Sequence, residues 1–371
     1  MNTPVAVAVA DADALEEFLQ RVPKMELHCH LLGSVRRQTF TDFVRRASMQ
    51  ALSRQVQAPL SEADIEAFYT RGEKPVGVLR VLRALDRWLL TTPDDFYRLT
   101  YEYLQDAASF GVCYSEFFWN PTGTSQIDGL GYPSVLGAIR RAIEDAQHDC
   151  GIVGRLVPAI DREAGANAAR QMVEWVIEHR VHEVPGIGID YQEALGPPEH
   201  FVEAYAMARR AGLRTTAHAG EFGLPARNVR CAMEQLQVDR IDHGYTIVDD
   251  PALVQQAIDT GLVFTVVPTN SYYLRTLAPE RWALDHPIRR MRELGLRVHP
   301  NTDDPTLHHV TPTEAWGTMV RDFGFDLDAL RLCMHNGLDS AWIDQTTRAQ
   351  WRIEWAARFD QLRTSLKLLS H

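Results

Sequence analysis

Lysine is almost missing from this 371-residue chain, which contains only Lys24, Lys74 and Lys367. Acidic residues outnumber basic ones by 49 to 38, so the formal net charge is -11 at pH 7 with neutral histidines. A chain with this charge and no basic runs lacks the usual means of binding nucleic-acid phosphates or an anionic membrane. We therefore expect neither nucleic acid nor a membrane as a partner.

The sequence also lacks cysteine pairs and long apolar runs. Its five cysteines show no C-x-x-C spacing, which favours reduced thiols in a reducing compartment over a disulfide framework. No apolar stretch is long enough for a membrane span. Residues 5–10 are apolar but lack a basic flank, so we interpret residues 1–20 as a leader and helix rather than a signal peptide. These absences predict a soluble cytoplasmic protein.

Apolar, β-branched runs alternate with longer amphipathic segments along the chain. This is the pattern of βα units around a parallel sheet. The expected strands are at residues 25–30, 112–119, 153–161, 186–191, 213–218, 239–243, 262–268 and 295–300. Eight strands with helical crossovers predict an α/β fold, a (β/α)₈ barrel of the TIM type. No linker, repeat or low-complexity tract interrupts the chain, so we expect residues 1–371 to form one domain.

Two helical regions extend beyond the eight-fold pattern. Residues 31–110 make the first connection far longer than one helix needs, and they contain a helical pattern at 76–90. We expect this insertion to cover the C-terminal mouth of the barrel. Residues 311–371 are predicted to form C-terminal helices that pack on the barrel.

Two histidines, His28 and His30, stand at the end of the first expected strand. Side chains at i and i+2 of a strand point to the same face, so both imidazoles project together. Three later segments also place metal-ligating or acid–base residue types after apolar runs, namely residues 216–221, 240–245 and 301–305. Because barrel chemistry is located at the C-terminal strand ends, we expect these four segments to converge.

The converging residue types suit a catalytic zinc site. Zinc binds imidazole nitrogens and carboxylate oxygens and leaves one position for water. The candidate ligands for one zinc ion per chain are His28, His30, His218 and Asp303. Zinc lowers the pKa of bound water from about 15.7 to about 7, and His243 or Asp303 could take the proton. Glu221 could protonate a ring nitrogen of the substrate, and Asp304 could form a hydrogen bond at its far edge.

Each of these residues alone also has a structural interpretation. A lone histidine is more often a core residue than a ligand, and Asp303-Asp304-Pro305 could be a capped turn. Glu221 alone would be a solvated helix start. We assign His308 and His309 to a helix start or loop. The coincidence of four such segments at strand ends favours a functional site over these separate explanations.

Together the four segments resemble the motifs of the adenosine deaminase family of the amidohydrolase superfamily. The matching residues are 23–31, 218–221, 243–245 and 301–305. The resemblance implies a zinc (β/α)₈ barrel that hydrolyses the 6-amino group of a purine and releases ammonia. By motif position it implies metal ligands at His28, His30, His218 and Asp303. It also implies Glu221 as proton donor to purine N1, His243 as the residue orienting the attacking hydroxide, and Asp304 as a contact of purine N7.

Two positions depart from the family pattern and concern substrate recognition. Leu32 stands where the family commonly has a carboxylate that binds ribose. Glu193 stands where a glycine usually presents its backbone N–H, and it would place a carboxylate or a different backbone geometry beside purine N3. We therefore expect intact metal and base chemistry with altered recognition of the sugar side.

The reaction expected by default converts adenosine to inosine and ammonia. Adenine, an N6-substituted adenine and a 5′-modified adenosine are the alternatives, and Leu32 favours an apolar 5′ group or no ribose. A different amidohydrolase reaction at a two-metal centre is disfavoured because no lysine stands at a strand end. A non-catalytic binding protein is disfavoured by the complete set of site residues. Iron, cobalt or manganese could replace zinc at such ligands.

Overall fold

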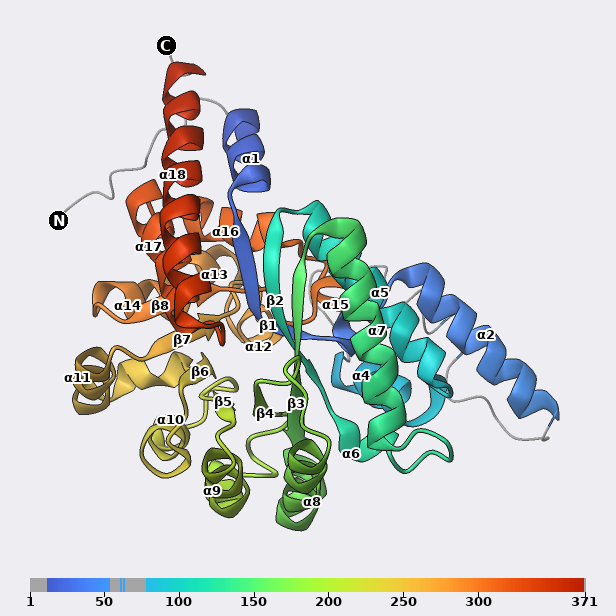
Figure 1. The fold of residues 1–371 in the computed structure, drawn as a ribbon. Helices are drawn as coiled ribbons and strands as arrows, with labels where there is room; N and C mark the ends of the chain where they lie inside the picture. The colour runs from blue at the N-terminus through green and yellow to red at the C-terminus, as the bar shows by residue number, and fades with distance from the viewer. Residues whose placement is uncertain (1–11, 54–60, 62, 64–77, 370–371) are drawn as a thin grey trace.

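The computed structural model describes residues 12–53, 61, 63 and 78–369, and its centre is a sheet of eight parallel strands in chain order (Figure 1). The strands are β1 (Lys24–His30), β2 (Val112–Trp119), β3 (Val153–Asp161), β4 (Gly186–Asp190), β5 (Arg214–Ala219), β6 (Arg240–His243), β7 (Val263–Val266) and β8 (Arg297–Pro300). Each predicted strand lies within two residues of the observed one at both ends. The predicted (β/α)₈ barrel is confirmed.

Helices surround the strands on the outside of the barrel (Figure 1). The helices of the first half are α1 (Ala12–Arg21), α2 (Arg37–Ser53), α4 (Val78–Ala84), α5 (Pro93–Ser109), α6 (Pro121–Thr124), α7 (Tyr132–Cys150) and α8 (Gly165–Glu178). The later helices are α9 (Val202–Arg210), α10 (Arg227–Cys231), α11 (Pro251–Thr260), α12 (Ser271–Thr276), α13 (Pro279–Asp285), α14 (Pro287–Glu293), α15 (Pro305–His308), α16 (Pro312–Arg321), α17 (Leu327–Ser340) and α18 (Gln345–Leu369). Short 3₁₀ or π turns are η1 (Leu32–Ser34), η2 (Leu85–Leu89), η3 (Arg162–Ala164), η4 (Pro198–Phe201), η5 (Ala232–Leu236) and η6 (Tyr245–Asp249). Among the residues described, no helix combines the length and apolarity that crossing a membrane requires.

Local sequence signals explain where these helices begin and end. At the start of α5, the Thr92 hydroxyl accepts the Asp95 N–H while the Asp95 carboxylate accepts the Thr92 N–H. This reciprocal capping box satisfies amides that have no partner within the helix. Helix α7 ends at Gly151, whose φ of 72° lies in the left-handed region that favours glycine.

The helix α4, from the long connection between β1 and β2, is attached to the C-terminal ends of β3 and β4. Arg83 of α4 donates from Nη2 to Asp161 Oδ1 at 2.9 Å and to Glu163 Oε2 at 2.9 Å. Its guanidinium also lies 3.6 Å from the centre of the Tyr191 ring. Three aliphatic side chains of α4, those of Val78, Leu79 and Leu82, line a cavity at this end of the barrel together with candidate residues. Residues 54–60, 62 and 64–77, which include the start of the predicted 76–90 helix, lie outside the described residues.

The first and last helices pack together at the opposite end of the barrel. In Figure 1, α1 and α18 lie side by side where β1 begins. The rings of Phe18 and Phe359 meet edge to face with centroids 5.1 Å apart. This end is closed by apolar contacts, and the polar strand ends lie at the other side. Residues 1–11 of the predicted leader lie outside the described residues.

The seam between β8 and β1 is joined through the backbone on both sides of Cys29. A bridge pairs Cys29 with Asp303, just after β8. The His30 N–H donates to the Asp303 carbonyl at 2.7 Å, and the Asp303 N–H donates to the His28 carbonyl at 3.1 Å. The backbone of Asp303 is therefore fixed between the two histidines of β1.

Side chains complete this seam closer to the middle of the strands. The buried Asn301 side chain accepts the Leu27 N–H at 2.8 Å and donates to the His299 carbonyl at 2.8 Å. Nearby, the Thr302 N–H and hydroxyl donate to Glu26 Oε2 at 3.0 and 2.6 Å. Polar side chains thus satisfy backbone groups that a regular ladder would otherwise pair.

Asn301→Ala removes both hydrogen bonds of the amide and leaves a buried N–H and a buried carbonyl without them. We expect this variant to lose about 2–4 kcal/mol of unfolding free energy, because each unsatisfied buried group costs about 1–3 kcal/mol. Urea unfolding monitored by circular dichroism measures the change. The control, Asn167→Ala on the exposed face of α8, should stay within about 0.5 kcal/mol of the parent. An unchanged unfolding midpoint for Asn301→Ala would contradict the role given to this side chain.

Candidate metal centre and active site

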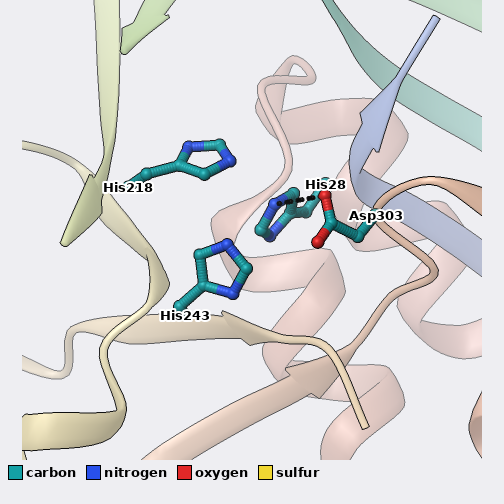
Figure 2. Close-up of side chains that lie close together, drawn as sticks. All are labelled: His28, His218, His243 and Asp303. Atoms are coloured by element: carbon teal, nitrogen blue, oxygen red, sulfur yellow. Dashed lines mark ion pairs between the residues drawn. The ribbon is translucent and has the colours of Figure 1, made fainter. Parts of the chain in front are cut away.

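Imidazoles from β1, β5 and β6 converge with a carboxylate that follows β8. Among the described residues, ligand-type atoms of His28, His218, His243 and Asp303 all lie within 4.8 Å of one another, and all four side chains are buried. Figure 2 shows these side chains directed towards a common centre. His30 joins the cluster, because its Nε2 lies 3.1 Å from His218 Nε2 and 3.2 Å from Asp303 Oδ1. The structure therefore brings together the four predicted ligands, with His243 beside them.

Polar contacts outside the cluster indicate which nitrogen of His28 and of His218 faces the centre. His28 Nδ1 lies 3.0 Å from the Thr265 carbonyl on β7, which can only accept, so Nδ1 carries the proton. His218 Nδ1 lies 3.3 Å from Asp242 Oδ2 on β6, a carboxylate that also accepts there. In both residues the lone pair of Nε2 is left facing the centre. Such partners orient metal-binding histidines.

His243 has a fixed tautomer for a less direct reason. The Tyr245 hydroxyl donates its only proton to the Val267 carbonyl at 3.0 Å and accepts the Val267 N–H at 2.9 Å. His243 Nδ1, 3.2 Å from this hydroxyl, must therefore donate to it. The lone pair of His243 Nε2 then points into the site, 3.5 Å from Glu221 Oε2.

The cluster fits a bound cation. His30 Nδ1 lies 3.3 Å from Asp190 Oδ2, so its Nε2 lone pair is directed at that of His218 Nε2, only 3.1 Å away. Two facing lone pairs repel unless a cation or a proton lies between them. Zinc–ligand distances of about 2.0–2.2 Å place neighbouring ligand atoms roughly 3 Å apart. Burial would lower the pKa of His30, but the carboxylates of Asp190 and Asp303, which can accept hydrogen bonds from its ring, raise it well above its ordinary value.

Three non-glycine residues at the site have a left-handed backbone. The φ angles are 68° for Tyr191, 68° for His243 and 65° for Asp303. Such conformations cost on the order of 1–3 kcal/mol each and occur mainly at functional sites, where the surrounding contacts hold them. For Asp303 those contacts are the two backbone bonds to β1. The strained turn directs its carboxylate back to the imidazoles.

The carboxyl groups of the site differ in charge. Burial, followed by the charges of Asp303 and Glu193, raises the pKa of Glu221 well above its ordinary value. Burial and the charge of Asp303 do the same to the pKa of Asp304. Burial would also raise the pKa of Asp303, but its hydrogen bond to His30 and the imidazole of His28 hold it well below its ordinary value. The shift of the Asp303 pKa is thus opposite to those of Glu221 and Asp304, which favours a charge on Asp303 and a proton on each of the other two.

A cavity of about 140 Å³ opens beside this cluster. Its floor includes His30, His218, Asp303 and the acids Glu221 and Asp304. The helix α4 covers it with three aliphatic side chains, Val78, Leu79 and Leu82. Asp190, Tyr191 and Arg275 also line it. The cavity thus combines an acidic, metal-suited floor with an apolar cover.

Two predicted substrate contacts are not in this cavity. Leu32, the first residue of η1, is 4% exposed and packs in the hydrophobic core. Glu193 is 1% exposed, and its carboxylate is occupied by the backbone N–H groups of Gly220 and Glu221 at 2.8 and 2.9 Å. These bonds occupy the oxygens that the expected contact with purine N3 would use, and that contact stays a prediction.

The sequence interpretation missed four residues of the site. Asp190 ends β4 and could have been found by the strand-end argument that found the others. Asp242 directly precedes His243 in the buried strand β6, and only His243 of the two was assigned to the site. Thr265 contributes its backbone carbonyl to His28, and residue type does not reveal a contact made by a backbone group. His308, assigned to a helix start or loop, lines the cavity with its Nε2 3.8 Å from Asp304 Oδ2.

The parallel barrel and its His/Asp cluster define the class, a (β/α)₈ metal-dependent hydrolase. The chain belongs to the adenosine deaminase family, whose model matches residues 23–354. An adenine deaminase of Vibrio parahaemolyticus is 30% identical over 342 residues, covering 91% of this chain and 96% of that protein. The crystal structure of an amidohydrolase from Burkholderia ambifaria, with bound zinc, is 54% identical with a TM-score of 0.93, covering 99% and 98% of the two chains. That of an adenine deaminase from Arthrobacter aurescens is 26% identical with a TM-score of 0.77, covering 93% and 99%.

Asp242→Asn should weaken metal binding, because an amide no longer offers His218 Nδ1 a charged acceptor. Loss of such an outer partner typically costs 10- to 100-fold in metal affinity. Competition with a chromophoric chelator measures the dissociation constant of zinc. The control is Asp259→Asn, which removes the same charge from the exposed face of α11. Equal affinity in Asp242→Asn and the control would show that Asp242 does not support the metal site.

Proposed function

We propose that this protein is a zinc-dependent hydrolase that replaces the 6-amino group of an aminopurine with oxygen and releases ammonia, with adenine as the first candidate substrate. The observation that carries the proposal is the convergence, beside one cavity, of inward-facing imidazole lone pairs, the Asp303 carboxylate and two carboxyl groups whose raised pKa favours the protonated form. Membership in the adenosine deaminase family and the adenine deaminases among its relatives support this reaction.

His28, His30, His218 and Asp303 would hold the metal. Their donor set of three imidazole nitrogens and one carboxylate oxygen suits zinc with one position left for water, and zinc is bound in the related Burkholderia ambifaria structure. When bound, zinc supplies the Lewis acidity that makes water a nucleophile near neutral pH. Asp303 can serve because its low pKa keeps it ionised at neutral pH.

Three side chains would handle protons and orient the purine. The raised pKa of Glu221 favours its protonated form, which can donate its proton to purine N1, an atom that only accepts. The raised pKa of Asp304 likewise favours a protonated form, which can donate a hydrogen bond to the acceptor N7. His243 presents the Nε2 lone pair needed to orient the attacking water and receive its proton.

The cavity supports a free base over a nucleotide. Four carboxyl groups, those of Asp190, Glu221, Asp303 and Asp304, line it beside one arginine, Arg275. Among the described residues that line the cavity, a phosphate would find no lysine and one arginine. The aliphatic cover from α4 offers no partner to ribose hydroxyls, and Leu32, which replaces the ribose-binding carboxylate, is buried in the core. The same cover would accommodate an apolar N6 or 5′ substituent, which keeps such purines as second candidates.

We further propose the protein's wider setting. A small-molecule aminopurine and water are its partners, without nucleic acid or membrane, and it acts in the cytoplasm as one domain over residues 1–371. The acidic net charge of -11 and the five free cysteines support this setting.

Ammonia release from adenine and from adenosine by the zinc-loaded protein tests the substrate. We expect kcat/KM to be at least 10-fold higher for adenine, because the three aliphatic side chains that α4 contributes to the cavity offer no partner to ribose hydroxyls. N6-methyladenine and a 5′-deoxy-5′-alkylthioadenosine are assayed alongside. Higher kcat/KM for adenosine would assign recognition of the sugar to residues other than those described. If none of the four compounds released ammonia with protein that holds one equivalent of zinc, the proposed reaction would be rejected.

Glu221→Gln removes the proposed acid while keeping nearly the same size and the hydrogen bond from Asn270 to Oε1, which is 3.2 Å long. We expect kcat to fall by about 10²–10⁴-fold, the usual contribution of general acid–base catalysis. Zinc content, measured by atomic absorption, should stay at one equivalent. A kcat within a few-fold of the parent would remove Glu221 from the mechanism.

A further inference from the structure

We infer that Glu193 is a positioning residue, whose buried carboxylate binds the backbone of residues 220–222 and thereby sets where the Glu221 carboxyl lies. This inference rests on the proposed function only for its consequence in catalysis. The contacts themselves stand on the geometry, so they can be tested separately.

The Glu193 carboxylate receives four N–H groups. Its Oε1 accepts from the Gly220 backbone at 2.8 Å and from Asn228 Nδ2 at 3.1 Å. Its Oε2 accepts from the Glu221 backbone at 2.9 Å and from the Phe222 backbone at 3.4 Å. Three consecutive backbone amides directed at one anion form a nest, an arrangement that binds negative charge. Both oxygens are occupied, and neither is left for a substrate.

The loop held by these bonds has little freedom of its own. Gly220 has a φ of 70°, and a Cβ atom there would lie 2.6 Å from Thr246 Oγ1 and 2.7 Å from Val229 Cγ2. The turn is therefore closely packed on one side and bound by Glu193 on the other. From this turn the Glu221 side chain reaches Asn270 and His243. The position of the proposed acid follows from the position of its backbone.

The type of residue at 193 is specific for this task. Within the part of the chain that the structure describes, no lysine or arginine forms an ion pair with Glu193, so N–H dipoles balance its buried charge. A glutamine would keep the volume but would turn an NH₂ group towards N–H donors. An aspartate would keep the charge but would end one methylene short. Only a glutamate supplies two acceptors at this reach.

The first test measures the contacts directly and needs no activity. Hydrogen–deuterium exchange of the zinc-loaded protein reports opening of individual amides. In Glu193→Gln we expect the amides of residues 220–222 to exchange at least 10-fold faster, with those of β5 unchanged. The matched control is Glu183→Gln, which removes another buried carboxylate, paired with Arg140 at 3.0 Å before β4 begins. Parent-like exchange at 220–222 in Glu193→Gln would overturn the inference, even if the proposed reaction proves wrong.

The second test is a double-mutant cycle on turnover of adenine. A misplacement of about 1 Å can cost about 10²-fold, so Glu193→Gln should lower kcat by about that factor, with KM and zinc content within twofold. In the Glu221→Gln background the same change should cost less than threefold, because the side chain that it positions is no longer an acid. Glu193→Asp should recover part of the loss, and Glu183→Gln should keep the parent kcat. Equal losses in the parent and in the Glu221→Gln background would show that Glu193 does not act through Glu221.

If Glu193→Gln fails to fold, Asn228→Ala offers a milder variant. It removes one of the four donors and leaves the three backbone bonds. We expect a two- to fivefold faster exchange at residues 220–222, with a proportionate fall in kcat. Parent-like values for both would overturn the inference.

Discussion

The site depends on the way in which β1 meets β8. The alternation of a strand places His28 and His30 on one face, but it says nothing about what lies opposite them. That is decided at the seam, where the backbone of Asp303 bonds to β1 on both sides of Cys29. The left-handed turn at Asp303 then returns its carboxylate to the imidazoles. One pair of backbone hydrogen bonds thus sets the distance between the nitrogen and oxygen donors of the proposed metal site.

Burial gives the neighbouring carboxyl groups opposite charge states. Asp303 stays ionised because the imidazoles of His30 and His28 stabilise its charge, and its charge in turn favours the protonated forms of Glu221 and Asp304. Groups whose pKa values are pushed apart in this way can be assigned as acid and base. Glu193 has two effects, since its charge raises the pKa of Glu221 while its oxygens hold the Glu221 backbone. The same buried anion thus favours both the location and the proton of the proposed acid.

The sequence was sufficient for the barrel and for the residues that converge at its mouth. Buried parallel strands have a distinct composition, and their C-terminal ends are known to meet, so polar residues at those ends could be combined without coordinates. The support behind them was not visible. Thr265 acts through its backbone carbonyl, a group that every residue type has. Glu193 contacts backbone amides 27 to 29 positions further along the chain, and the sequence does not indicate this pairing. For Leu32, the residue type indicated that the ribose-binding carboxylate is missing, but the sequence did not show that this side chain, at the start of η1, is buried in the core.

The cavity has a different chemical character where α4 covers it. Arg83 attaches α4 to the ends of β3 and β4 through Asp161, Glu163 and the ring of Tyr191. These contacts hold α4 in place, with Val78, Leu79 and Leu82 lining the cavity. In the proposed function, Glu221 and Asp304 would contact nitrogens of the purine that every substrate of this kind shares. The aliphatic side chains of α4 would contact the substituent on the purine. We therefore expect differences in substrate preference among related deaminases to arise from α4 and its attachment rather than from the metal-suited and acidic residues.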